Sequence, residues 1–395
     1  MNISQKQFWL GAAILSGVVF LSIVIFLIFS MGAAARGENG GDRNRADQQK
    51  ALEGTALELS VQDVAEVTVD AKAEEISPKR SAKIRAIGDM MLDRTVYLHS
   101  LQADDFSFPF LNIADFLLDA DLTVGNLEGA ITDNKSIANG TGGQRFYFTF
   151  SPRTVEPLTK YFDVVSFANN HAHNFGADGL FQSRTYLDES GLTYFGDPNN
   201  DPNHLSVVVE KNDIIFGFVG FHELVGFGFD DVIAEVEKLR PEVDVLIAYP
   251  HWGHEYITTH PSAAQKAEGH ELIDAGVDIV IGAHPHVIQP IEIYNDKVIF
   301  YSLGNFIFDQ YFSEETQQSL AIEIMVEERP AFAEASADKR EFDFDFNIIP
   351  IRVSEKSQPE LAGETEANQI LNTLSKYSIA TSTIQDQIKE GYIDL

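Results

Sequence analysis

Cysteine is absent from this 395-residue chain, and basic residues are few. Without cysteine the protein has no disulfide, no thiolate metal site and no cysteine nucleophile, so any bound metal needs nitrogen and oxygen ligands. Sixty Asp and Glu residues outnumber 28 Lys and Arg residues, which gives a formal charge of −32 at pH 7. Because such a charge repels a phosphate backbone, we exclude nucleic acid as a partner.

Charge is also missing between Lys6 and Arg36, and apolar residues dominate from Phe8 to Met31. At about 1.5 Å per residue, a helix over this run can cross a hydrocarbon core of about 30 Å. A cleaved signal peptide is the alternative, but its apolar region usually has only about 15 residues. We therefore predict a single-pass transmembrane anchor within residues 1–35.

The charges that flank this anchor leave its orientation open. Four basic residues follow the apolar run within residues 36–50, whereas only Lys6 and the amino terminus precede it. By the positive-inside rule alone the following domain would stay inside, but long translocated domains override that count. We expect an extracytoplasmic domain held at the membrane. Residues 36–80 are polar and rich in Ala, Glu and Asp, which is typical of a flexible linker.

After this linker, short apolar runs alternate with helical patterns, and 44% of the whole chain is hydrophobic. The predicted strands are 83–87, 164–168, 214–219, 243–248, 279–281, 298–301 and 342–353, and the predicted helices are 109–120, 178–190, 230–239, 262–275 and 364–377. Buried strands between helices indicate a layered α/β domain, which we place at residues 81–355. We expect residues 356–395 to form a C-terminal helical tail.

Polar clusters follow the strands at the points where loops begin, which is where ligands bind in open α/β sheets. The clusters are Gly88-Asp89, Gly125 to Glu128, Asn169 to His171, His251 to Glu255 and Gly282 to His286. They offer carboxylate, amide and imidazole groups, and none contains a serine nucleophile elbow or a glycine-rich phosphate loop. The sequence therefore predicts one shared metal site.

The ligand types narrow the choice of metal. His284 and His286 can both turn toward one point, and Pro285 between them stiffens the loop. Neutral imidazole, carboxylate and amide oxygen together suit Mn, Fe, Zn or Co rather than Ca or Mg alone. We expect one or two divalent ions of the Mn, Fe or Zn class.

Six ordered motifs carry a family resemblance. They are Gly88-Asp89-Met90-Met91-Leu92-Asp93-Arg94, Gly125-Asn126-Leu127-Glu128-Gly129, Ala168-Asn169-Asn170-His171, His251-Trp252-Gly253-His254-Glu255-Tyr256, Gly282-Ala283-His284-Pro285-His286-Val287 and Tyr301-Ser302-Leu303-Gly304-Asn305-Phe306. From about Ile84 to Gln310 the chain resembles the CapA/PgsA family of capsule, or poly-γ-glutamate, synthesis proteins, in the calcineurin-like metallophosphoesterase superfamily. The resemblance implies a four-layer α/β/β/α sandwich.

The resemblance also implies roles for single residues. The implied metal ligands are Asp89, Glu128 as the bridging carboxylate, the amide oxygen of Asn170, and His251, His284 and His286. His171 would donate a proton to a leaving oxygen or steady a phosphoryl group, and its alternative role is to hold the loop by a hydrogen bond. Arg94 would hold an anion, or pack as an ordinary side chain.

Met91 departs from the superfamily pattern, which has a histidine at this point of the first motif. One metal position thereby loses a nitrogen ligand. We expect that position, with Asp89 and His286, to be weak or empty, and the other position to be tighter. Asp93 or His254 is a hypothetical replacement ligand.

Asn174 is a second departure, because CapA-like sequences commonly carry Asp there. The change weakens the expected support for His171. Four further polar residues of the motifs are expected to support the site, namely Asn126, His254, Glu255 and Asn305.

Two functions follow from the resemblance. In the first, a metal-dependent hydrolase acts on a phosphorus or carbonyl centre. In the second, a non-catalytic, membrane-tethered subunit of a polymer synthase or exporter binds poly-γ-glutamate or a related anionic polymer. The depleted first motif argues mildly against efficient two-metal hydrolysis, and the negative charge requires cations or a local basic groove if a polyanion is to bind.

Overall fold

The computed structural model describes residues 80–136, 146–329 and 341–395. The anchor predicted within residues 1–35 and the linker before Arg80 lie outside the described residues. Among the helices of the described ranges, none combines the length and the apolar character needed to cross a membrane.

The larger sheet of the described chain has nine strands, with parallel strands at its centre. Its order is β16-β15-β14-β1-β2-β5-β6, while β13 pairs with β1 and β17 with β15. β13, β1, β2, β5 and β6 run parallel, and β14 to β17 pair antiparallel to their neighbours. The bounds are β1 Ser81–Met90, β2 Leu122–Leu127, β5 Val164–Ser166, β6 Thr193–Phe195, β13 Asn305–Ile307, β14 Gln318–Glu328, β15 Phe342–Val353, β16 Pro359–Leu361 and β17 Tyr392–Asp394.

The second sheet has six strands in the order β11-β12-β10-β9-β8-β7. β12, β10, β9 and β8 are parallel, and β11 and β7 pair antiparallel at the two edges. The bounds are β7 Ser206–Lys211, β8 Ile214–His222, β9 Val245–His251, β10 Ile279–Ile281, β11 Ile291–Tyr294 and β12 Lys297–Phe300, with a separate pair of β3 Ala130–Ile131 and β4 Thr149–Phe150.

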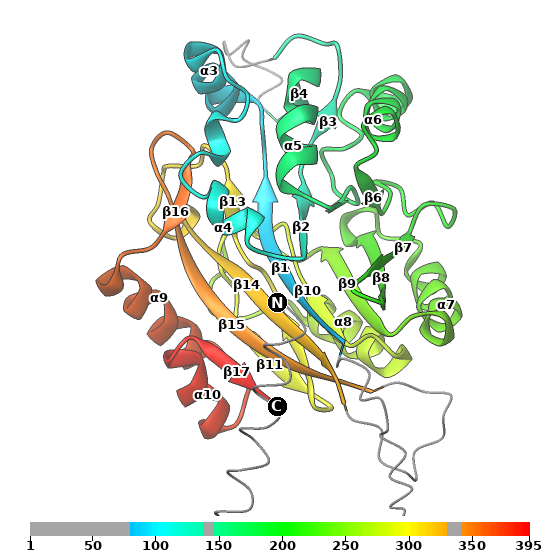
Figure 1. The fold of residues 1–395 in the computed structure, drawn as a ribbon, viewed down its shortest axis with the longest axis vertical. Helices are drawn as coiled ribbons and strands as arrows, with labels where there is room; N and C mark the ends of the chain where they lie inside the picture. Colours follow the sequence, from blue (N-terminus) through cyan, green and yellow to red (C-terminus); the bar gives the residue numbers. More distant parts are fainter. Residues whose placement is uncertain (1–79, 137–145, 330–340) are drawn as a thin grey trace, which may run out of the picture. The chain divides into compact units, whose positions relative to one another are not determined.

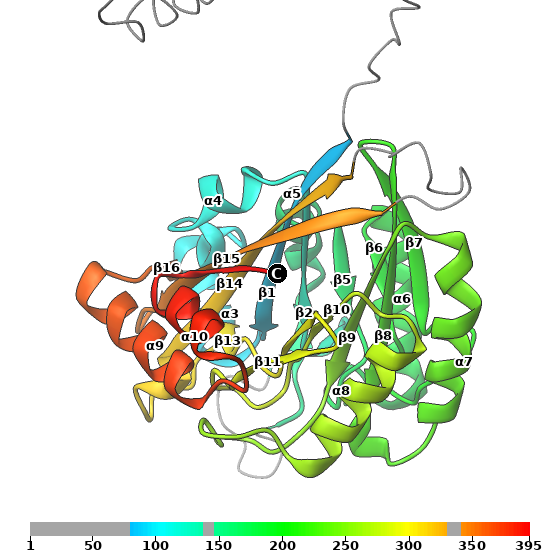
Figure 2. The same cartoon turned by 90° about the horizontal axis from the view of Figure 1, so that it is seen from below.

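Three hydrophobic cores separate the layers (Figures 1 and 2). The inner core lies between the two sheets and takes Ile84 from β1 and Phe216 from β8. A second core joins the larger sheet to helices α3 to α6, and a third joins the smaller sheet to α7 and α8. The helix bounds are α3 Arg94–Ala103, α4 Ala114–Leu118, α5 Val155–Tyr161, α6 Gly176–Ser190, α7 Phe229–Leu239, α8 Ala263–Ala275, α9 Glu364–Tyr377 and α10 Ser382–Lys389. The predicted α/β class is confirmed, with α3 to α6 outside the larger sheet and α7 and α8 outside the smaller one.

Local sequence determines where helix α8 begins and ends. The Ser262 side chain accepts from the backbone N of Gln265, whose own side chain accepts from the backbone N of Ser262, and this reciprocal cap starts the helix. Gly276 ends it with φ 117°, a left-handed conformation that glycine adopts without steric cost. Both ends agree with the prediction for residues 262–275.

The helix predicted over residues 109–120 is wrong as a single element. A 3₁₀ turn, Phe108–Phe110, comes first, and only Ala114–Leu118 is α-helical. The buried Phe110, Ile113 and Leu117 gave the helical spacing. However, the backbone N of Phe110 bonds Ser107 O and that of Ile113 bonds Phe110 O, so the first part of the segment is held by three-residue turns.

Residues 356–395 contain more than the predicted helical tail. β16 and β17 both pair with β15 and so extend the larger sheet. Ile370 and Leu374 of α9, and Ile388 of α10, belong to the inner core. This segment therefore packs as part of the sandwich, because its apolar side chains cover the core beside β15.

Candidate metal centre

The candidate site lies at the carboxyl ends of parallel strands from both sheets (Figure 1). Asp89 lies near the end of β1, and His251 ends β9. Glu128 follows β2, and His284 follows β10. The backbone N of His284 donates to Asp89 Oδ2 over 3.2 Å, which joins the two sheets here. Strand direction thus brings together residues that are far apart in the sequence.

Glu128 is a fully buried carboxylate at this edge. Neither Oε1 nor Oε2 has a hydrogen-bond partner among the described residues. His286 Nε2 lies 3.6 Å and His171 Nε2 lies 3.8 Å from Oε1. Burial, with Asp89 and then Glu255 nearby, raises the pKa of Glu128 well above its ordinary value. A bound cation would satisfy such a carboxylate.

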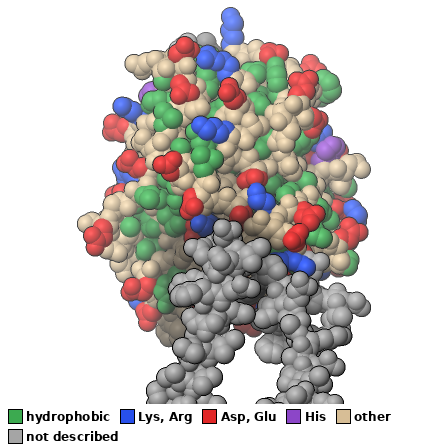
Figure 3. All heavy atoms as spheres, viewed as in Figure 1, with side chains coloured by type: hydrophobic (Ala, Val, Ile, Leu, Met, Phe, Trp, Pro, Cys, Tyr) green, Lys and Arg blue, Asp and Glu red, His purple; other side chains and the backbone are tan. Residues whose placement is uncertain are grey.

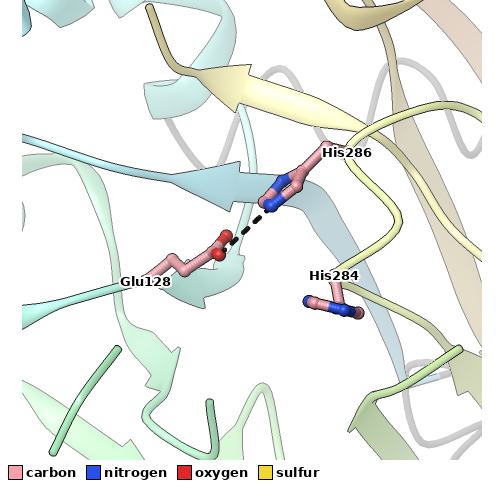
Figure 4. A group of neighbouring side chains, drawn as sticks. All are labelled: Glu128, His284 and His286. Carbon is pink, nitrogen blue, oxygen red and sulfur yellow. Dashed lines mark ion pairs between the residues drawn. The ribbon is translucent and has the colours of Figure 1, made fainter. Parts of the chain in front are cut away.

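Glu128, His284 and His286 form a group of ligand atoms (Figure 4). One ligand atom from each residue lies within 4.8 Å of the others, and the Glu128 carboxylate is directed at the His286 ring. His284 Nδ1 is buried and has no partner among the described residues. Burial, and then the neighbouring His286, lower the pKa of His284 well below its ordinary value, which favours the neutral form that binds metal. These donors fit an ion of the Mn, Fe or Zn class.

The loop that carries both histidines has a strained backbone. His284 has φ 97° and His286 has φ 60°, in the left-handed region that non-glycine residues avoid. Such residues cost about 1–3 kcal/mol each and persist where the surroundings hold them. Pro285 O accepts from the backbone N of Tyr256 at 2.9 Å. A Cβ on Gly282 would lie 2.1 Å from Tyr301 O, so the loop packs tightly against β12.

Asn305 fixes the ring of His286. Its Nδ2 donates to Gln310 Oε1 at 3.1 Å and to Thr316 O at 3.0 Å, so its Oδ1 is the acceptor for His286 Nδ1 at 3.0 Å. In the neutral ring the lone pair then lies on Nε2, which is 3.6 Å from Glu128 Oε1. A ring held in this way by an amide oxygen is typical of a metal-binding histidine.

Asn126 supports two of the predicted ligands. Its Nδ2 donates to Asp89 Oδ1 at 2.8 Å and lies 3.3 Å from His251 Nδ1. The other nitrogen of His251, Nε2, lies 2.9 Å from Asn170 Oδ1. Burial, and then His284, lower the pKa of His251 well below its ordinary value. An ion bound by Asn170 and His251 would replace the hydrogen bond that these two side chains make.

His171 is held by Asn174, whose amide oxygen stands where the sequence predicted weaker support than a carboxylate would give. Asn174 Oδ1 accepts from the backbone N of Phe148 at 2.7 Å and lies 3.0 Å from His171 Nδ1, so this ring nitrogen carries the hydrogen. The Nε2 of His171 lies beside Glu128 and 3.2 Å from Asn170 Nδ2, from which it accepts a hydrogen bond. Burial lowers the pKa of His171 to about 4, so the ring is neutral near pH 7.

Arg94 and Asp93 make other contacts. Arg94 forms an ion pair with Asp309, and its guanidinium lies 4.9 Å from the ring centre of Phe148. These contacts agree with the packing role for Arg94. Asp93 is buried and accepts from the backbone N of Thr149 in β4 at 2.9 Å, which disagrees with a role as replacement ligand.

His254 and Glu255 are exposed on the loop after β9. Each lies near enough to influence a buried neighbour, because His254 helps to lower the pKa of His284 and Glu255 helps to raise that of Glu128. Neither belongs to the ligand group around Glu128 in the described chain. The sequence prediction also missed His222, which ends β8 beside His251 with ring centres 5.6 Å apart.

The sequence is similar to those of known capsule and PGA biosynthesis proteins. Two curated relatives are the capsule biosynthesis protein CapA of Bacillus anthracis, 24% identical over 310 residues, and the PGA biosynthesis protein CapA of Bacillus subtilis strain 168, 29% identical over 255 residues. The alignments cover 73% and 59% of this chain and 72% and 65% of those proteins.

A crystal structure described as a novel phosphatase from Mycoplasma pneumoniae aligns with 72% of this chain and 92% of its own, at 15% identity and a TM-score of 0.39. A likeness at that level carries no argument about activity. The family comparison is stronger, because residues 83–310 match the family described as bacterial capsule synthesis protein PGA_cap. This match covers more than half of the chain and all six polar motifs. The chain therefore belongs to the bacterial capsule synthesis protein family PGA_cap.

Proposed function

We propose that this chain is a CapA-type protein of capsule or poly-γ-glutamate biosynthesis, with a divalent-metal site in a calcineurin-like metallophosphoesterase sandwich. The observation that supports the metal site is the Glu128 carboxylate, which is buried and has no hydrogen-bond donor among the described residues. It is flanked by the rings of His171 and His286. The two CapA relatives support the biological role.

Hydrolysis is the chemistry that this site suits best. A bound ion would lower the pKa of a coordinated water and stabilise developing negative charge. Glu128, Asn170, His251, His284 and His286 would hold one or two ions, with Asp89 in the weaker position. The Nε2 of His171 carries no hydrogen, because Asn174 accepts from the other ring nitrogen. This Nε2 would accept a proton and return it to a leaving group in place of its hydrogen bond from Asn170 Nδ2.

A polymer-binding role without catalysis is the second candidate, and Met91 favours it. The Met91 side chain is buried, and its sulfur lies 3.2 Å from the backbone N of Asp93. It supplies no imidazole to the ion position of Asp89 and His286. A site with one ion would bind carboxylates of an anionic polymer but would be a poor two-metal hydrolase.

The surface charge is compatible with either candidate. On the face seen in Figure 3, acidic and basic side chains are interspersed among the described residues. Bound cations at the site would offset the overall negative charge near a polyanion. We further propose that residues 1–35 anchor the chain in the membrane, that residues 36–80 form the linker, and that the domain that begins at residue 81 is extracytoplasmic.

Elemental analysis of the purified chain tests the metal site, with His284→Ala and Asp89→Ala variants alongside. Two ions per chain that are lost in both variants would favour hydrolysis and justify a screen of phosphoester and γ-glutamyl substrates. One ion that is lost only in the His284 variant would favour polymer binding. Absence of any ion from the wild-type chain, after addition of Mn²⁺ or Zn²⁺, would contradict the proposal.

A further inference from the structure

His222 has no role in the site described so far, yet it faces that site. It is the last residue of β8 and pairs in register with His251, the last residue of β9. Further back along the same register, Phe218 pairs with Ile247, and both point into the inner core. Because side chains alternate along a strand, His222 and His251 also point to that inner face, toward the larger sheet.

The ring of His222 has one free nitrogen. Its Nδ1 lies 3.1 Å from Pro198 O, and because a carbonyl oxygen only accepts, Nδ1 carries the hydrogen. Its Nε2 is buried and has no partner among the described residues, in a side chain that is 4% exposed. A ring N–H given to a backbone carbonyl, with the opposite nitrogen free, is the arrangement of a metal-bound histidine.

The backbone holds His222 in place. Asn200 Oδ1 accepts from the backbone N of His222 at 2.8 Å, and Asn200 Nδ2 donates to the backbone O at 3.0 Å. Next to it the imidazoles form a row, since the ring centres of His222 and His251 are 5.6 Å apart and those of His251 and His284 are 4.7 Å apart. A buried nitrogen without a partner costs about 1–3 kcal/mol, and a cation at this place would remove that cost.

We propose that Nε2 of His222 is a ligand of the divalent ion that Asn170, His251 and His284 would hold. This inference rests on the proposed metal site and adds a residue to it. The ion position on the His251 side thereby gains a third imidazole, while the position of Asp89 and His286 lacks the nitrogen that Met91 displaces. The two positions should therefore differ strongly in affinity.

Titration of the metal-free, full-length chain with Co²⁺ and Zn²⁺ tests this ligand. The variants are His222→Ala, His222→Gln and, as a matched control, His260→Ala, because His260 is exposed and bonds only its neighbour Thr259 among the described residues. We expect His222→Ala to weaken binding of the tighter ion at least about 10- to 100-fold, the loss found for groups that merely support a ligand. The visible Co²⁺ absorption should weaken and shift, and His260→Ala should match the wild type.

If circular dichroism shows that the His222→Ala chain is unfolded, the His222→Gln chain provides the test of this ligand. Its amide preserves most of the side-chain volume but replaces nitrogen by oxygen, so its Co²⁺ spectrum should shift while the fold is retained. Wild-type affinity and an unchanged Co²⁺ spectrum in the folded His222 variants would overturn this inference and leave the proposed function intact. Absence of any ion from the wild-type chain would overturn both.

Discussion

At the residue scale, Glu128 is the clearest candidate ligand, because its buried carboxylate has no hydrogen-bond partner among the described residues. In the metal-free protein we expect Glu128→Gln to raise the free energy of unfolding by about 1–3 kcal/mol at pH 7.5. The amide replaces a carboxyl group whose burial raises its pKa, so that its ionisation, or its retention of a proton, costs stability at this pH. The Gln amide can also donate to the free Nε2 of His286. The same variant should lose metal. Urea unfolding with a chelator present, and then with Zn²⁺, measures both effects.

The exposed Glu189 of α6 gives the control, since Glu189→Gln removes the same charge from the surface. The free energy of unfolding of the Glu189→Gln chain should change by no more than about 0.5 kcal/mol. A Glu128→Gln chain that is less stable than the wild type in chelator would show that the carboxylate has a protein partner, and the case for a cation would fail.

Glu268 on α8 should give the protein a measurable pH dependence. Burial, with Glu223 and then Glu271 nearby, raises the pKa of Glu268 to about 8. A raised carboxyl pKa contributes stability that is complete below about pH 4.5 and is lost as pH rises through about 8. The wild type should therefore lose stability relative to Glu268→Gln between pH 5 and pH 8.5. Unfolding of both chains at the two pH values checks this, and parallel curves would refute it.

The sequence could name most residues of the site but could not assign their protons. Asp89, His251 and His284 lie at strand ends, and strand ends are visible in the pattern of apolar runs. Which ring nitrogen is free depends on acceptors such as Asn305 and Asn174, whose contacts arise only in the folded chain. For Asn174 the expectation of weaker support stays a prediction, because a neutral amide oxygen takes the place of the carboxylate oxygen as the acceptor for His171.

At the scale of the elements, the contact between β1 and β13 fixes the positions of the loops that carry site residues. A Cβ on Gly88 would lie 1.9 Å from Gly304 O, the atom that accepts from the backbone N of Asp89. We expect Gly88→Ala to lower the free energy of unfolding by about 1–3 kcal/mol or more, because the two strands must separate. Metal affinity should fall as well, since β13 carries Asn305. Thermal unfolding and metal titration of the variant measure these losses.

Gly363 provides a matched Gly→Ala change, because a Cβ there meets nothing within 4 Å and its φ is −63°. The free energy of unfolding of the Gly363→Ala chain should change by no more than about 1 kcal/mol, the scale of a helix N-cap effect. If Gly88→Ala were as mild as this control, the tight packing of β1 on β13 would not govern the site.

Predictability of the elements followed their length and their apolar character. The long strands β8, β9 and β15 have enough apolar residues to be recognised, and β15 was placed at its observed bounds, Phe342–Val353. β10 has only three residues but was also placed at its bounds, Ile279–Ile281, because all three are apolar. β16 and β17 have three residues each and include charged residues, so neither an apolar run nor a period is visible. His222 was missed for a related reason, because the predicted strand stopped at 219 while β8 continues to it.

For the whole molecule, residues 355–395 should be needed for folding. A chain that stops after Ser354 would expose the inner core where Ile370, Leu371, Leu374, Ile388 and Ile393 pack. At about 1.5–3 kcal/mol for each buried side chain, the loss matches the total stability of about 5–15 kcal/mol of a typical domain. We expect this truncated chain to be insoluble or unfolded by circular dichroism.

Removal of Leu395 alone is the comparison, because this residue is 49% exposed and lies beyond β17. That chain should keep its melting temperature. Should the longer truncation stay soluble with an unchanged melting temperature, the inner core would be complete without residues 355–395, and the prediction would be contradicted.

The direction of β1 has a consequence for access to the site. The strand starts at Ser81, and Asp89 lies eight residues further on, so the described amino terminus and the site are separated by about 26 Å at roughly 3.3 Å per residue. A tether joined at Arg80 would hold the molecule by the end remote from its ligands. The mouth of the site would then open away from the point of attachment, and a long chain arriving from bulk solution could reach it without first passing the anchored end.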